Sequence, residues 1–304
     1  MGFRRYPGRF GAVITAMVTP FDDAENLNLT AAVELAKFLE RNGSDALVLA
    51  GSTGESTSLS DEERLELFEA VLEAVTIPVI TCCAGANTRH SIELSKKVAQ
   101  LNPGGFLVVT PYYIRPPQSG LIAHFRAVAE ACEPHPVILY DIPARTGRKI
   151  YTETVLRLAN EVKNIVAIKD AAGNIVETAK LINLMPDDFE LYCGDDSLCF
   201  AMASLGASGV ISVASHWCAK EIREMMDLIN QGEMVKAVQV NKELETSFSF
   251  ESSEKYPNPM PTKAMLRAIG LNVGQCRLPL GLADQELDHQ AALLSKHFID
   301  RLIV

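Results

Sequence analysis

Short apolar runs alternate with helical patterns along most of this chain. Eight of these runs are rich in β-branched residues and continuously apolar, which is typical of strands in a parallel sheet that helices cover on both faces. The predicted strands lie at residues 11–19, 46–50, 78–82, 106–109, 137–140, 165–169, 191–193 and 209–213.

A segment with helical periodicity follows each predicted strand. One of them opens at Ser60 with a capping box, since a glutamate stands three residues later. The predicted helices lie at residues 30–41, 60–74, 88–101, 119–131, 152–160, 175–184, 196–205 and 219–230. Eight strand–helix units in about 220 residues predict an α/β fold of the (β/α)8 TIM-barrel type. An open, doubly wound sheet is the alternative that this pattern leaves.

The alternation stops after Gly232. Helical patterns without intervening strands continue at residues 233–253, 262–269 and 285–303, and three prolines separate the first two. We therefore expect a catalytic barrel over residues 1–232 and a helical C-terminal extension over residues 233–304.

Charge and composition exclude several classes of partner. The net charge is −10, and no run of lysine and arginine exceeds two residues, which disfavours nucleic acid and acidic membranes. No apolar segment approaches the ~20 residues that span a bilayer, and no apolar region follows the N-terminal arginines as in a secretory signal. Seven cysteines without a CxxC pair predict reduced thiols in a cytoplasmic protein. Six scattered histidines do not predict a metal site.

The sixth predicted strand ends on a lysine, Lys169. A buried ammonium is unfavourable unless it is paired, so such a lysine either extends to the surface or serves chemistry. Burial favours the neutral amine, which can attack a carbonyl to form a Schiff base. Because active sites of barrels lie at the C-terminal ends of the strands, this position favours the catalytic interpretation.

Other polar residues follow the strand ends. The segment GSTGE, residues 51–55, offers backbone N–H groups and the hydroxyls of Ser52 and Thr53 to a small carboxylate, although a plain turn is the simpler interpretation. It lacks the lysine of a P-loop, which disfavours nucleotides. Tyr140 can relay protons or be a core tyrosine. Asp195 and Asp196 are interpreted as a structural pair at a helix start.

The ordered segments GSTGE, TPYY, YDIPARTG, AIKDAAGN and GVIS resemble one family. It is the family of pyruvate-dependent class I aldolases that includes dihydrodipicolinate synthase and N-acetylneuraminate lyase. The resemblance covers residues 11–229 strongly and the helical tail more loosely. It implies a barrel whose lysine captures pyruvate as an imine, without a metal or an added cofactor.

The resemblance assigns roles to individual residues. It implies that Lys169 forms the Schiff base, that Tyr140 donates and accepts the proton, and that Thr53 and Tyr113 continue the relay. Further implied roles are the pyruvate carboxylate site (Ser52, Thr53) and the backbone that flanks the substrate (Gly194, Ile211). Members of the family commonly carry threonine where this chain has Ser52, and the hydroxyl is kept.

The acceptor substrate is predicted from Arg145 in the segment YDIPARTG. Since the resemblance assigns Ser52 and Thr53 to the pyruvate carboxylate, a second anion-binding group implies a second carboxylate. The resemblance then implies condensation of pyruvate with aspartate 4-semialdehyde in lysine and diaminopimelate biosynthesis. One alternative is a sister lyase acting on N-acetylneuraminate or on another sugar-derived keto acid. A second is a barrel that binds keto acids without turnover, and Arg145 could instead form a salt bridge to Asp141.

The resemblance also bears on assembly and regulation. In the family, the equivalent of Tyr113 reaches the neighbouring subunit's site, which implies a homo-oligomer, a tetramer built as a dimer of dimers. Regulated relatives carry histidines and a glutamate around a lysine effector. Here Asp61, Arg64 and Ser91 stand at those positions, which predicts weak feedback inhibition by lysine.

Overall fold

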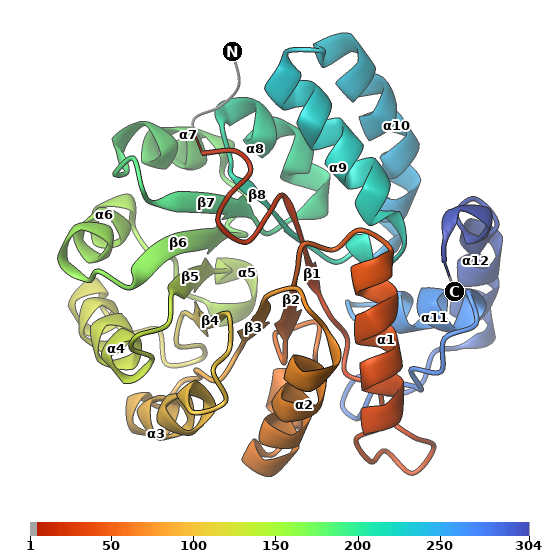
Figure 1. Ribbon diagram of the computed structural model, residues 1–304, viewed down its shortest axis with the longest axis horizontal. Helices are drawn as coiled ribbons and strands as arrows, with labels where there is room; N and C mark the ends of the chain where they lie inside the picture. The colour runs from red at the N-terminus through yellow and green to blue at the C-terminus, as the bar shows by residue number, and fades with distance from the viewer. Residues whose placement is uncertain (1–4, 304) are drawn as a thin grey trace.

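Eight parallel strands close into a barrel at the centre of the computed structural model, which describes residues 5–303 (Figure 1). The strands pair in chain order, and β1 pairs with β8 to close the cylinder. They are β1 (Val13–Ala16), β2 (Ala46–Leu49), β3 (Val79–Thr81), β4 (Gly105–Val109), β5 (Val137–Asp141), β6 (Ile165–Asp170), β7 (Glu190–Cys193) and β8 (Gly209–Ser212). The (β/α)8 barrel is confirmed, and the open sheet is excluded.

Helices follow the strands and form the outer ring (Figure 1). They are α1 (Leu29–Arg41), α2 (Asp61–Ala74), α3 (Thr88–Ala99), α4 (Gln118–Ala131), α6 (Thr152–Glu161), α7 (Ile175–Leu184), α8 (Cys199–Leu205) and α9 (Ser215–Gln231). The predicted capping box at α2 is confirmed, because the side chains of Ser60 and Glu63 each accept the other's backbone N–H. Two short helical turns that periodicity did not predict follow β2 and β5: η1 (Ser56–Ser58) and α5 (Pro143–Thr146). The helix predicted at residues 196–205 begins with a separate turn, η2 (Asp196–Leu198), before α8.

Alternation along the strands decides which side chains enter the barrel. Tyr140 on β5 and Ala167 on β6 belong to the interior cluster, whereas Leu139 and Ile168 pack against the surrounding helices. Since successive strand residues point to opposite faces, Lys169 shares the inward orientation of Ala167. The lysine at the end of β6 therefore points into the barrel and not toward the helices.

The C-terminal extension consists of α10 (Met234–Phe250), α11 (Met260–Ala268), α12 (Gln285–Ser295) and η3 (Ile299–Arg301). Its last residues return to the end of α1, where the side chain of Asn42 donates to the carbonyl of Ile303 and accepts its N–H. The predicted barrel includes residues 1–4, and the predicted extension includes residue 304. These five residues lie outside the described part of the chain. In the described part of the chain, no helix is long and apolar enough to cross a membrane.

Candidate active site

Lys169 and Tyr140 lie side by side at the C-terminal end of the barrel. Their Cα atoms are register partners on β6 and β5, and Lys169 Nζ lies 4.5 Å from the centroid of the Tyr140 ring. Both side chains are only 4% exposed, and within residues 5–303 Lys169 forms no ion pair or hydrogen bond. The burial of Lys169 is therefore not explained by a structural ion pair among these residues.

Gly194 makes room for the lysine side chain. A Cβ atom at this position would lie 2.9 Å from Lys169 Cε and 2.9 Å from Ala171 Cβ, closer than packed atoms allow. Ile211, on β8, is 1% exposed and belongs to the same interior cluster as Tyr140. Both residues that the resemblance places beside the substrate thus lie near the lysine or in the barrel interior.

The two hydroxyls of the GSTGE loop face different partners. The Ser52 hydroxyl lies 3.5 Å from the Tyr140 hydroxyl, whereas the Thr53 hydroxyl accepts a hydrogen bond of 2.9 Å from the side-chain amide of Asn258. The resemblance implies a relay through Thr53, whereas the hydroxyl within hydrogen-bonding distance of Tyr140 is that of Ser52. Thr53 is 3% exposed and tied to the C-terminal extension.

Arg145 lies at the cavity that Tyr140 and Ser52 line. Its guanidinium donates to the backbone carbonyl of Asn258 at 3.4 Å and has no ion-pair partner in residues 5–303. The alternative of a salt bridge to Asp141 is excluded, because Asp141 pairs with Lys149 at 3.2 Å. Burial raises the pKa of Asp141 to about 6, and the charge of Lys149 opposes that rise.

This cavity has a volume of about 310 Å³ and opens at the ends of β2, β4 and β5. Ser52, Tyr112, Tyr140, Arg145 and Asn258 contribute to its lining. Lys169 does not line it directly, but its amine packs against the ring of Tyr140, which does. The cavity is large enough for two small acids and has cationic and hydroxyl groups at its wall, as expected of a binding site.

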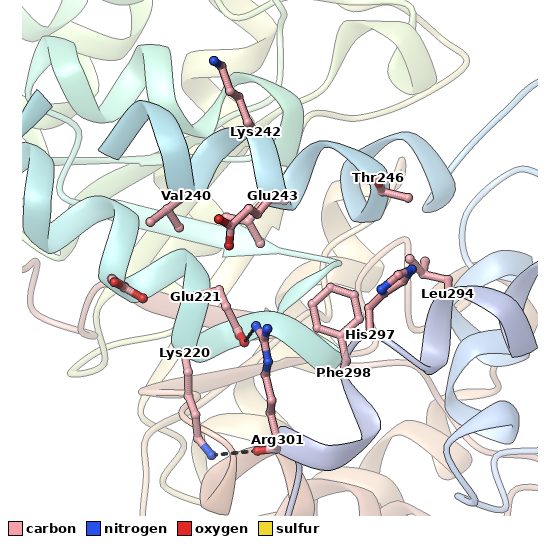
Figure 2. Close-up of a pocket in the computed structure, with 12 residues that line it drawn as sticks. Lys220, Glu221, Val240, Lys242, Glu243, Thr246, Leu294, His297, Phe298 and Arg301 are labelled. Atoms are coloured by element: carbon pink, nitrogen blue, oxygen red, sulfur yellow. Dashed lines mark hydrogen bonds and ion pairs between the residues drawn. The ribbon is translucent and has the colours of Figure 1, made fainter. Parts of the chain in front are cut away.

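A second cavity, of about 440 Å³, lies between α9, α10 and the C-terminal segment (Figure 2). Figure 2 shows Arg301 turned toward Glu221, with which it forms an ion pair of 3.1 Å, while Lys220 donates to the Arg301 carbonyl. None of the predicted site residues lines this cavity. The cavity at the strand ends is the candidate active site although it is smaller, because Ser52, Tyr140 and Arg145 line it.

Tyr113 does not enter the cavity of its own chain. It is 91% exposed, and its φ of +71° is a left-handed conformation that is uncommon for a bulky residue. Its backbone N–H donates to the carbonyl of Thr146 at 3.3 Å, which fixes the loop beside the cavity. The structure therefore brings together Lys169, Tyr140 and Ser52, and leaves Tyr113 outside that group.

Asn258 is a site residue that the sequence analysis missed. It is 7% exposed, contacts both Thr53 and Arg145, and its side-chain carbonyl accepts from the Thr262 hydroxyl at 3.2 Å. It stands between prolines 257 and 259, which indicated only a helix break, and 205 positions separate it from Thr53. No local pattern could have placed it at the strand ends.

Asp195 and Asp196 both stand at the start of η2, as interpreted, but their carboxylates bind different groups. Asp195 is the cap, since its carboxylate accepts the N–H of Ser197 at 3.1 Å. Asp196 instead accepts the N–H groups of Val213 and Ala214, at 2.7 and 3.0 Å, and joins the loops after β7 and β8. Within the described residues, no cluster of metal-ligating side chains is placed to hold a metal ion.

A closed barrel with an inward lysine beside a tyrosine, and a cavity at the carboxyl ends of its strands, defines a (β/α)8-barrel enzyme. Comparison with known proteins makes this more specific. The sequence pattern of the Dihydrodipicolinate synthetase family matches residues 9–297. The chain belongs to this family.

Individual relatives agree with this assignment. The chain is 46% identical over 276 residues to 4-hydroxy-tetrahydrodipicolinate synthase 1 of Halalkalibacterium halodurans, covering 89% of this chain and 91% of that protein. The crystal structure of dihydrodipicolinate synthase from Bacillus anthracis superposes with a TM-score of 0.90 at 38% identity, covering 94% and 98% of the two chains. The crystal structure of the synthase from Cyanidioschyzon merolae with lysine bound also superposes with a TM-score of 0.90. Its sequence is 41% identical, and the match covers 93% of this chain and 96% of that chain.

Proposed function

We propose that this protein is a 4-hydroxy-tetrahydrodipicolinate synthase, which condenses pyruvate with aspartate 4-semialdehyde through an imine on Lys169. The observation that carries the proposal is the buried Lys169 amine, 4.5 Å from the ring centroid of Tyr140 and without an ion-pair partner in residues 5–303. The names of the relatives support the same reaction.

The imine forms when the neutral Lys169 amine attacks the keto carbon of pyruvate and water leaves. Tyr140 serves as the proton donor and acceptor, and the Ser52 hydroxyl, 3.5 Å away, extends its hydrogen-bond path. Loss of a methyl proton then gives an enamine. Because the protonated imine accepts the electron pair, this mechanism uses no metal and no added cofactor.

The enamine carbon attacks the aldehyde of the second substrate. The amino group of that substrate then attacks the imine carbon, closes the ring and releases Lys169. Arg145 supports aspartate semialdehyde as the acceptor, because it is a cation without an anionic partner in residues 5–303 and lies in the cavity. A guanidinium matches a carboxylate in a bidentate fork, and a neutral sugar aldehyde offers no such partner.

A homo-oligomer completes the proposed site, with a dimer as the smallest active unit and a dimer of dimers as the assembly. Support comes from Tyr113 and Ile114, which are 91% and 61% exposed on a loop beside the cavity. Two large apolar side chains presented together on a constrained loop are suited to contact a second copy of the chain. The seven buried, unpaired cysteines are compatible with the expected cytoplasmic location.

Steady-state assays test the proposed reaction. The enzyme should consume pyruvate and aspartate semialdehyde together and should not turn over N-acetylmannosamine. Efficient use of N-acetylmannosamine would replace the synthase with a lyase. Imine formation without turnover of any aldehyde would favour a keto-acid sensor.

Sedimentation and subunit mixing test the assembly. Tyr113→Phe and Tyr140→Phe variants should each be impaired, and mixing them should restore some activity if subunits exchange. A fully active monomer in sedimentation would refute the shared site.

A further inference from the structure

Glu55 is a buried acidic residue that the proposed reaction does not use. It ends the GSTGE loop with a φ of +53°, and its side chain is fully buried. One of its carboxylate oxygens lies 2.7 Å from Nζ of Lys263 on α11, whose side chain is 1% exposed. The two charges form an ion pair removed from water, between the barrel loop and the C-terminal extension.

The second carboxylate oxygen of Glu55 is also bound by the extension. The backbone N–H of Arg277 donates to it at 2.9 Å, and the Arg277 guanidinium binds the Ser58 carbonyl at 2.7 Å. Lys263 in turn donates to the carbonyl of Gln275 at 2.9 Å. Both oxygens of Glu55 are thus held by residues more than two hundred positions later in the chain.

The loop connects Glu55 to the hydroxyls of the candidate site. The backbone N–H of Glu55 donates to the carbonyl of Ser52 at 3.2 Å, and Glu55 and Ser52 both line the cavity. Between them, the carbonyl of Gly54 accepts from the Thr19 hydroxyl at 2.7 Å. A movement of the Glu55 carboxylate would therefore also move the backbone of Ser52 and Thr53, which belong to the same turn.

The pair is sensitive to the loss of either partner. Burial lowers the pKa of Lys263, and the negative charge of Glu55 opposes that shift. A buried charge that loses its partner must move toward water or find a new partner. For Glu55, such a move would displace the loop that carries Ser52 and Thr53, the residues that the resemblance assigns to the pyruvate carboxylate.

We propose that Lys263 is a positioning residue for pyruvate: by holding Glu55, it fixes Ser52 and Thr53 where they bind the substrate carboxylate. This inference rests on the proposed function. It makes the C-terminal extension part of the substrate site, although Lys263 itself does not touch the substrate.

The test compares two variants by pyruvate KM, kcat and melting temperature. Lys263→Met should raise the pyruvate KM roughly tenfold or more, with a smaller change in the aspartate-semialdehyde KM, because only the first carboxylate site is disturbed. The double variant Glu55→Gln/Lys263→Met leaves no unpaired charge, so its melting temperature should recover toward the parent. Its pyruvate KM should stay high, because the loop is no longer held.

A merely structural pair would behave differently, since the double variant would then regain the parental pyruvate KM together with its stability. That result overturns the inference, and so does a parental pyruvate KM in a folded Lys263→Met protein. Asp288→Asn is the matched control, because it breaks the pair that Arg267 of α11 forms with Asp288 of α12, away from the loop. It should leave the pyruvate KM unchanged.

A separate readout distinguishes this inference from the proposed function. Borohydride trapping of the parent enzyme over a range of pyruvate concentrations measures imine formation directly. If the parent forms no imine, the proposed function fails. If the parent forms it and both variants show the parental pyruvate dependence, only the role of Lys263 fails.

Discussion

Tyr140 and Lys169 face each other across adjacent strands of the barrel, with the lysine amine 4.5 Å from the centre of the tyrosine ring. The tyrosine hydroxyl extends toward the Ser52 hydroxyl, 3.5 Å away. Lysine, tyrosine and serine thus form a short chain from the barrel interior to the cavity wall. This order suits an amine that forms an imine and a hydroxyl pair that moves its protons.

Replacing Tyr140 with phenylalanine should lower kcat by about 10²–10⁴-fold, the usual contribution of a positioned proton donor and acceptor. The ring that packs against Lys169 is kept, so the fold should remain intact. Tyr192→Phe is the matched control, because that tyrosine is also buried in the barrel, but its hydroxyl donates to Glu190 at the other end. Equal losses of kcat in both variants, measured by steady-state kinetics, would contradict the role of Tyr140.

Replacing Arg145 with alanine should separate the two substrates. The variant should still form the pyruvate imine, because Lys169 and Ser52 are untouched, but it should lose the cation for the second carboxylate. Truncating one partner of such a pair costs about 2–5 kcal/mol, which corresponds to a loss of roughly 30-fold or more in kcat/KM for aspartate semialdehyde.

Arg148→Ala is the control for Arg145, since Arg148 donates to the carbonyl of Arg115 and does not line the cavity. It should retain most of the parental kcat/KM. Near-parental kcat/KM for aspartate semialdehyde in the Arg145 variant would show that another group binds the acceptor.

Lysine should inhibit this enzyme weakly. Ser91 is buried, and its hydroxyl already donates to the carbonyl of Asn87 and accepts the N–H of Gly85. Asp61 is paired with His90 at 2.7 Å. The amino group of a bound lysine would lack the carboxylate partner that regulated relatives offer. The charge-assisted hydrogen bond that is missing contributes about 1.5–3 kcal/mol. Strong inhibition at sub-millimolar lysine in initial-rate measurements would refute this prediction.

Acid should destabilise the protein partly through His216. The ring is fully buried, its Nε2 accepts the N–H of Val18, and burial lowers its pKa to about 4. Unfolded histidine has a pKa of about 6.5. Between these values the unfolded chain binds the proton and the folded chain does not, so stability falls as the pH drops through this window, by up to about 1.4 kcal/mol per pH unit.

Urea unfolding at fixed protein concentration measures this effect. A His216→Gln variant should be less stable at neutral pH, but its loss of stability on acidification should be smaller than that of the parent. The same substitution at His289, which is exposed on α12, should keep the parental pH slope. An unchanged slope in His216→Gln would show that this histidine does not carry the effect.

His216 also illustrates the limits of prediction from sequence. With Trp217 it directly follows the eighth strand, and both side chains are buried, which no local pattern in the sequence indicated. The barrel itself was predictable, because eight apolar runs alternate with helical periods. Which face of each strand points into the barrel was not predictable. Both faces are apolar, so the strands lack the alternation of polar and apolar residues that would distinguish them.

The site was predictable to the extent that it lies in strand ends. Lys169 and Tyr140 both end apolar runs, which placed them at the strand ends, and the resemblance paired them. The partners of the GSTGE loop were not predictable, because Asn258, Lys263 and Arg277 come from the C-terminal extension. The orientation of Ser52 toward Tyr140, and of Thr53 away from it, depends on those distant contacts.

The central claim is that Lys169 forms an imine with pyruvate, and intact-mass spectrometry after treatment with pyruvate and borohydride tests it most directly. Reduction turns the imine into a stable secondary amine, so the protein should gain the mass of one reduced pyruvate adduct, and peptide mapping should place it on Lys169. Without pyruvate, or in a Lys169→Ala variant, no adduct should form. An unmodified parent enzyme, or full labelling of the Lys169→Ala variant, would contradict the account.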